Sequence, residues 1–200
     1  MHQDYKITQS QRQLIILSSI YLILQYVIQG FCFHSDFLTR LYSSEFNILN
    51  ILSILAYGYL LLTFVSYFKH YKLTKLVTLT WIIIITDLIV KQILHATNLF
   101  FDIFPETLFS LINLFILVIE IYWAVLILRL NKVNYAAMDT FRHIIFSIIA
   151  STILSLIVTA AVVTADLGPN NNIGYILLAI PFFYTIDLTR KLDIKTFDQT

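Results

Sequence analysis

The sequence is organised around residues 78–98, which read TLTWIIIITDLIVKQILHATN. The first half of this stretch is as apolar as any membrane span, whereas the second half carries Asp87, Lys91 and His95. A charged side chain at bilayer depth is costly, and it usually lies against protein or water and marks a functional site. The stretch therefore predicts a transmembrane helix with a functional polar face.

The whole chain shares this apolar character. Its 200 residues are 58% hydrophobic and 12% charged, and the mean hydropathy is +0.80. A soluble chain is typically about 45–50% apolar and about 25% charged. The excess lies in runs near the roughly 20 residues that a helix needs to cross a bilayer. Strands of a membrane barrel would instead give shorter, alternating segments, so we predict an all-α membrane protein.

Six apolar runs divide the chain. They lie at about residues 14–33, 47–68, 76–96, 108–130, 143–165 and 173–188. The short basic turn at 69–75 predicts that the second and third spans form an antiparallel pair. Residues 166–172, DLGPNNN, end the fifth span because Gly, Pro and Asn interrupt helices, and Pro181 should kink the sixth. We expect a single membrane domain over residues 1–200, built as a bundle of six transmembrane helices.

The first apolar run has a competing interpretation as a secretory signal peptide. The run is longer than the apolar core of such a peptide, and no A-x-A-like cleavage site follows it. We therefore expect a retained helix. The chain has a single cysteine, Cys32, which excludes an internal disulfide.

The basic residues predict the orientation of the chain in the membrane. With six spans, one side of the membrane receives the N-terminus, the 69–75 turn, the 131–142 loop and the C-terminal tail. The basic residues on that side are Lys6, Arg12, Lys69, Lys72, Lys75, Arg129, Lys132, Arg142, Arg190, Lys191 and Lys195. The opposite side holds Arg40 alone. Cytoplasmic loops carry the excess of Lys and Arg, so both termini should be cytoplasmic, where the same residues would attract anionic lipid.

The polar residues of the third span share one helical face. At about 100° per residue, Thr80, Asp87, Lys91, His95 and Asn98 fall within a narrow arc. Asp87 precedes Lys91 by four residues, which is the favourable order for an ion pair along a helix. An aligned face of this kind is expected to point into the bundle rather than toward lipid.

The fourth and first spans offer partners for this face. Asn113 and Glu120 are seven residues apart on the fourth span, and Glu120 lies near its middle, as Asp87 does in the third. Lys91 could therefore lie between Asp87 and Glu120. Burial and repulsion would disfavour ionisation of both carboxylates, so the cluster could carry a proton or attract a cation. Gln25 and Gln29 on the first span could line the approach to it, or hydrogen-bond to neighbouring helices.

Two further interpretations of these residues remain open. The charged cluster could be an ion-pair network that only fixes helix register. The pattern Asp87-Leu88-x-x-Lys91 also recurs as Asp187-Leu188-x-x-Lys191, at matching ends of the third and sixth spans. Two related halves would fit the inverted repeats of transporters, although three matching residues also arise by chance.

The histidines suggest a haem alternative. His34 and His95 fall toward the outer side, and His70 and His143 toward the inner side. Two same-level pairs on different helices are what a di-haem membrane cytochrome needs for its axial ligands. His70 and His143 adjoin basic residues, however, and fit interfacial positions equally well.

No catalytic motif accompanies these features. The sequence contains no Gly-rich phosphate loop, nucleophile elbow, HExxH motif or Cys/His metal cluster. Enzymatic activity is therefore the less favoured reading, and nothing indicates nucleic-acid binding beyond basic residues that topology explains.

These observations predict a small transport or channel protein with an intramembrane site for an ion, a proton or a small polar solute. Asp87, Lys91 and Glu120 would form the site, and the residues lining its approach would be Gln25, Gln29, His95 and Asn113. The alternatives are a sensor, receptor or assembly subunit that transports nothing, and an electron-transfer protein with b-type haem. Besides the bilayer, we expect a second copy or another membrane protein as a partner, because a 23.3 kDa bundle is small for enclosing a pathway.

Overall fold

The computed structural model describes residues 5–31, 48–90, 92–94, 105–130, 135, 137–164 and 174–194. Within these ranges the chain is nearly all helical, with two short strands. Five helical stretches are long and apolar enough to cross a membrane: Gln9–Gly30, Ile48–His70, Thr74–Leu94, Leu111–Arg129 and Met138–Val158. The predicted all-α class is confirmed, a bundle fits the helices, and their composition indicates an integral membrane protein.

The helices extend beyond the apolar runs that predicted them. Helix α1 (Gln9–Phe31) begins five residues before its apolar run, and α7 (Met138–Thr164) also begins early. Thr8 and Gln11 cap α1 reciprocally: the Gln11 N–H donates to Thr8 Oγ1 at 3.1 Å, and the Thr8 N–H donates to Gln11 Oε1 at 2.9 Å. Such a capping box satisfies two N–H groups that lack partners within the helix. Hydropathy therefore located the membrane-embedded part of each helix but not its polar ends.

The chain divides into two compact units. Unit 1 comprises Met1–Tyr57 and Asn131–Thr200, and unit 2 comprises Gly58–Leu130. The division falls inside helix α3 (Ile48–His70), so each unit contains part of that helix. The prediction of a single membrane domain stays a prediction, because packing within each unit does not test it.

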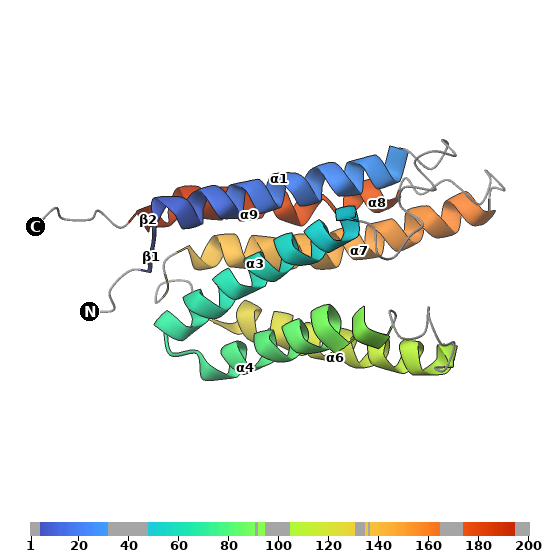
Figure 1. The fold of residues 1–200 in the computed structure, drawn as a ribbon, viewed down its shortest axis with the longest axis horizontal. Helices are drawn as coiled ribbons and strands as arrows, with labels where there is room; N and C mark the ends of the chain where they lie inside the picture. The colour runs from blue at the N-terminus through green and yellow to red at the C-terminus, as the bar shows by residue number, and fades with distance from the viewer. Residues whose placement is uncertain are drawn as a thin grey trace, which may run out of the picture. The chain divides into compact units, whose positions relative to one another are not determined.

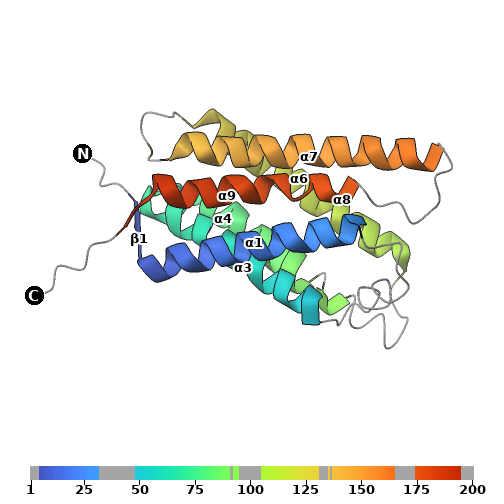
Figure 2. The same cartoon turned by 90° about the horizontal axis from the view of Figure 1, so that it is seen from above.

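In unit 1, helices α8 (Gly174–Leu177) and α9 (Ile180–Lys191) contact both α1 and α7 and lie between them (Figures 1 and 2). Together they occupy the sixth predicted span. The helix is interrupted at residues 178–179, immediately before Pro181 at the start of α9. Proline lacks the N–H that would continue a helical ladder but is favourable in a first turn, which explains a break at this point.

The α8–α9 segment runs antiparallel to α1 along most of its length. Ile176 lies against Gly30 near the end of α1, and the rings of Phe182 and Tyr26 stack with centroids 5.8 Å apart. Further along, the hydroxyls of Thr185 and Ser19 are 2.6 Å apart and both residues are buried. Later residues of the C-terminal segment thus meet successively earlier residues of α1.

Strands β1 (Lys6–Ile7) and β2 (Asp193–Ile194) tie the two ends of unit 1 together. They pair in parallel, with Lys6 opposite Asp193 and Ile7 opposite Ile194. The Ile7 side chain is fully buried. The residues before α1 and after α9 therefore meet at the same end of unit 1.

Unit 2 is built from α4 (Thr74–Ile83), the π-helix η2 (Ile84–Val90) that continues it, and α6 (Glu106–Arg129), together with the second part of α3. Helix α6 contacts both α4 and η2 and runs antiparallel to them (Figure 1). An aromatic cluster lies at its core: Phe64 and Phe68 of α3 pack against the Trp123 ring, with centroids 6.2 and 6.3 Å apart.

Candidate functional site

The inner face of α4 leads to Asp87. Leu76, Thr80 and Ile83 are buried at spacings of four and three residues, and Asp87 is the next position in this series. Asp87 is half-buried. Spacings of three and four follow one face of an α-helix, and this pattern holds as far as Ile83. From Ile84 the backbone is π-helical, so the partial burial of Asp87, rather than its spacing, places it next to the packed face.

The backbone around Asp87 is a π-helix rather than an α-helix. Element η2 covers Ile84–Val90, with Asp87 at its centre. The Thr86 hydroxyl donates to the Ile82 carbonyl at 2.7 Å, directly before this change in geometry. A π-turn contains an extra residue per hydrogen-bonded ring, changes the direction of its side chains, and is found frequently at functional sites. The irregular backbone thus coincides with a charged residue of the membrane span.

Helix α6 presents Glu120 on its packed face. Ile116, Trp123 and Ile127 are buried, and Glu120 is half-buried between the first two. The spacings along this series are four, three and four residues, which is the pattern of a helix face packed against another helix. Asn113 is exposed, although it lies seven residues before Glu120.

One hydrogen bond fixes the register between these two faces. Trp123 Nε1 donates to Thr80 Oγ1 at 2.9 Å, and the Thr80 hydroxyl donates to the Leu76 carbonyl at 2.7 Å. A hydroxyl can donate and accept at once, so the buried pair is satisfied. Sequence analysis placed Thr80 on the polar face but missed Trp123. The position of Trp123, three residues after Glu120, could have placed it on the same helical face as Glu120.

This register brings the two carboxylates to neighbouring levels. From the Thr80–Trp123 bond, Asp87 lies seven residues forward along α4 and η2, and Glu120 lies three residues back along α6. Because the helices are antiparallel, both displacements point the same way. At the α-helical rise of about 1.5 Å per residue the two levels would differ by about 6 Å, and the wider turns of η2, which rise less per residue, make the difference smaller. Each carboxylate also interacts with other groups. Lys91 and His95, which were predicted to join them, lie outside the described residues.

The predicted glutamines belong to a separate network in unit 1. The Tyr21 hydroxyl and the Ser53 hydroxyl both donate to the Leu49 carbonyl, each at 2.7 Å. Ser53 also contacts the side-chain amide of Gln25, which is nine-tenths buried. Ser53 has one proton to donate, so that proton is shared between two acceptors, the side-chain oxygen of Gln25 and the Leu49 carbonyl. Gln29, one turn further along α1, is half-buried.

The histidines described by the structure contact aromatic rings. The His143 ring stacks on Tyr184 with centroids 5.8 Å apart, and the His70 ring meets Tyr71 edge-on at 4.9 Å. Among the described residues, no group of three or more His, Cys, Asp or Glu side chains could hold a metal ion. His34 and His95 lie outside those residues. The haem alternative stays a prediction, and an absorbance spectrum without a Soret band would contradict it.

Comparison of the chain with protein-family models, curated proteins and solved structures returns no match.

Proposed function

We propose that the chain is a small integral membrane transport or channel protein, with an intramembrane site built around Asp87 and Glu120 for an ion, a proton or a small polar solute. The observation that supports this most is the position of Asp87. It lies in a π-helical turn next to the packed face of α4, at a level close to Glu120 of α6. Lys91 and His95 keep the roles expected from the sequence.

The energetics favour a use for these carboxylates beyond packing. An acidic residue at the centre of a membrane helix costs about 2.5–3.5 kcal/mol on insertion scales. Two such residues on facing helices double that penalty unless their surroundings compensate it. The groups that Asp87 and Glu120 already contact contribute to this compensation, and a bound cation or proton, or Lys91, would add to it. The π-turn places the first carboxylate where the helix geometry is already irregular, which is common where helices carry function.

The proposed topology has both termini in the cytoplasm. Pairing of Lys6–Ile7 with Asp193–Ile194 supports having both ends on one side of the membrane. An even number of crossings is then required, and α8 with α9 supplies a sixth beside α1. The excess of basic residues on the side of the termini supports the cytoplasmic assignment.

The test is flux through the purified full chain in liposomes. Protons are followed with a trapped pH-sensitive dye, and sodium and potassium with ion-selective dyes, each under an imposed gradient. Asp87→Asn and Glu120→Gln remove the proposed charges. Asp187→Asn is the matched control, because Asp187 occurs in the same sequence pattern but pairs with Lys191 at the end of α9. We expect about a tenfold or greater loss of flux in the first two variants, equivalent to at least about 1.4 kcal/mol, and wild-type flux in the control.

Each contrary result has a clear meaning. Wild-type flux in both carboxylate variants would remove the proposed site. Absence of flux in the wild type under every gradient would favour a sensor, receptor or assembly subunit. In that case, joint replacement of Asp87, Lys91 and Glu120 by Asn, Met and Gln should restore stability that Lys91→Met alone removes, because it leaves no unpaired charge.

A further inference from the structure

The turn between α3 and α4 has a tightly defined backbone. The Leu73 N–H donates to the Phe68 carbonyl at 2.9 Å, and the Lys72 N–H donates to the Lys69 carbonyl at 3.1 Å. These two bonds form the Schellman motif that ends many helices. In this motif the residue after the helix cap takes a left-handed conformation, and Lys72 has φ of 57°.

Lysine is an unexpected residue at this position. Glycine is usual there because it has no Cβ to clash in the left-handed region. Among the described residues, the non-glycine residues with a positive φ are Lys72 and Ala137. The backbone therefore gives no reason for lysine at position 72, and a reason must come from its side chain.

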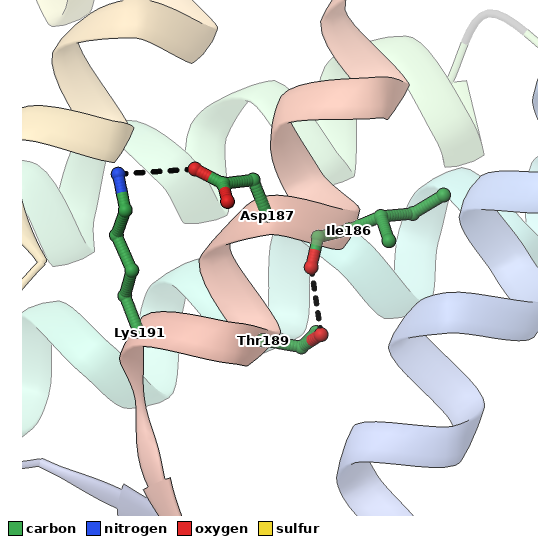
Figure 3. A network of polar contacts seen from close by, with 4 residues as sticks. All are labelled: Ile186, Asp187, Thr189 and Lys191. Atoms are coloured by element: carbon green, nitrogen blue, oxygen red, sulfur yellow. Dashed lines mark hydrogen bonds and ion pairs between the residues drawn. The ribbon is translucent and has the colours of Figure 1, made fainter.

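The side chain of Lys72 belongs to a cluster of exposed cations, which we call the basic turn: Lys69, Lys72 and Lys75. All three are exposed, and none forms an ion pair with any residue that the structure describes. No acidic residue occurs from Phe68 to Thr86. By contrast, Lys191 on α9 lies 3.0 Å from the Asp187 carboxylate (Figure 3). Within the part of the chain that the structure describes, no carboxylate therefore pairs with the positive charge of the basic turn.

The position of the basic turn in the chain suits a membrane surface. It joins two helices, α3 and the α4–η2 span, that are long and apolar enough to cross a membrane. Its base is held by the aromatic side chains of Tyr67, Phe68 and Tyr71, which are buried against one another. The connection between these helices is three residues long, residues 71–73, and Lys69 and Lys75 lie in the adjoining helical turns. If both helices cross the bilayer, the three cations lie near one membrane surface.

We propose that the basic turn is a binding site for the phosphate groups of anionic phospholipids in the leaflet that it faces. Lys69, Lys72 and Lys75 supply the ammonium donors, and the tight backbone turn at Lys72 keeps the three residues close together along the chain. Lysine binds phosphate as a mobile point charge, which suits a headgroup that is laterally mobile. This interaction is independent of the proposed transport site.

The test measures lipid preference directly around the protein. Full-length protein is reconstituted into phosphatidylcholine vesicles in which brominated phosphatidylglycerol replaces an increasing share of the lipid, and tryptophan fluorescence is read. Trp81 is the main reporter, because it is exposed on α4 six residues after Lys75 whereas Trp123 is buried. We expect stronger quenching by brominated phosphatidylglycerol than by brominated phosphatidylcholine. Each lysine removed should lower that preference by about fivefold at low salt.

The variant Lys72→Gly removes one positive charge from the basic turn without disturbing its backbone. Glycine suits the left-handed backbone better than lysine, so thermal stability should be kept or raised while the lipid preference falls. Lys72→Arg should retain the preference, and the control Lys191→Gln should leave it unchanged because that charge is already paired. Unchanged preference in Lys72→Gly and in the combined variant Lys69→Gln, Lys72→Gln and Lys75→Gln would overturn the proposal. An equal loss in Lys191→Gln would also overturn it, since the effect would then be general surface charge.

Discussion

The two units of the molecule hold their helices together by different means. In unit 1, α1 meets the C-terminal helices through a glycine, at Gly30, and through paired hydroxyls, Ser19 and Thr185. In unit 2, the core is aromatic, and an indole donates to the Thr80 hydroxyl. The π-helix η2, with Asp87 at its centre, belongs to the unit with the aromatic core.

The two Asp-Leu-x-x-Lys sequences sharpen this contrast. Asp187 lies on the regular helix α9, is 40% exposed, and forms an ordinary ion pair with Lys191 one turn later (Figure 3). The nearby Thr189 hydroxyl donates to the Ile186 carbonyl at 2.7 Å. Asp87 instead lies in a π-helix within a span. The same residue pattern therefore gives two different environments, and the division into units does not follow two halves of three spans.

The largest expected effect tests the aromatic core of unit 2. Trp123→Ala should lower the free energy of unfolding by about 3–5 kcal/mol, because it leaves a cavity beside Phe64 and Phe68. Trp123→Phe keeps a ring but loses the bond to Thr80, so it should cost about 0.5–1.5 kcal/mol. Both are measured by denaturation with sodium dodecyl sulfate in mixed micelles. Equal losses in the two variants would show that the hydrogen bond, not the ring, carries the stability.

The next prediction is that a glycine-to-alanine substitution changes the free energy of unfolding in opposite directions in the two units. A Cβ at Gly30 would clash with Ile176 Cγ1 and lie 3.3 Å from the Ile176 backbone nitrogen, whereas a Cβ at Gly58 would meet Leu88 Cδ1 at 3.2 Å. Gly30→Ala should therefore destabilise by about 1–3 kcal/mol through overpacking. Gly58→Ala should be neutral or stabilise by up to about 1 kcal/mol, because alanine favours helix.

The same denaturation assay in mixed micelles measures both glycine variants. Adding Ile176→Ala to Gly30→Ala should restore part of the loss, since it removes the clashing side-chain atoms. Destabilisation by Gly58→Ala as large as that by Gly30→Ala would contradict the contrast between the units.

The smallest effect concerns the hydroxyl pair of unit 1. Ser19 Oγ lies 2.8 Å from the Ile15 carbonyl, and Thr185 Oγ1 lies 2.7 Å from the Phe182 carbonyl, in addition to their mutual contact. The two hydroxyls have two protons for three possible hydrogen bonds, so one of the three bonds is always missing. A double-mutant cycle with Ser19→Ala and Thr185→Val should give a coupling of about 0.6 kcal/mol, the average for such pairs in membranes. A coupling indistinguishable from zero would show that the pair only fills space.

Hydropathy predicted the helical class and the five long spans. The five long spans appear where their apolar runs predicted them, because a bilayer requires about 20 apolar residues per crossing. The capping box at Thr8 and Gln11 extended α1 beyond its run, and its T-x-x-Q spacing was readable but overlooked. The pairing of β1 with β2 was not predictable, since two-residue strands have no periodicity and depend on contacts between the chain ends.

The candidate site was predictable only in part. Helical spacing predicted that Asp87 and Glu120 turn toward the bundle, and both residues are half-buried in the structure, but their role as a site stays a prediction. Spacing also grouped Asn113 with Glu120, but Asn113 is exposed. Whether a position on a helix face is buried depends on which other helices extend as far along the helix as that position. The π-turn has no local signature. It depends on how Ile84–Val90 packs against α6, and that information is distributed over both helices.

The pairing of α1 with the C-terminal helices has a consequence for biosynthesis. Unit 2 is one continuous segment, so it can assemble once residue 130 has entered the membrane. Helix α1 is made first, yet Thr185, which pairs with its Ser19, lies 166 residues later. During synthesis the hydroxyl of Ser19 must therefore face lipid or a chaperone until the last helix arrives. A ribosome stalled before residue 174 should leave α1 accessible to crosslinking by the insertion machinery, with unit 2 already closed.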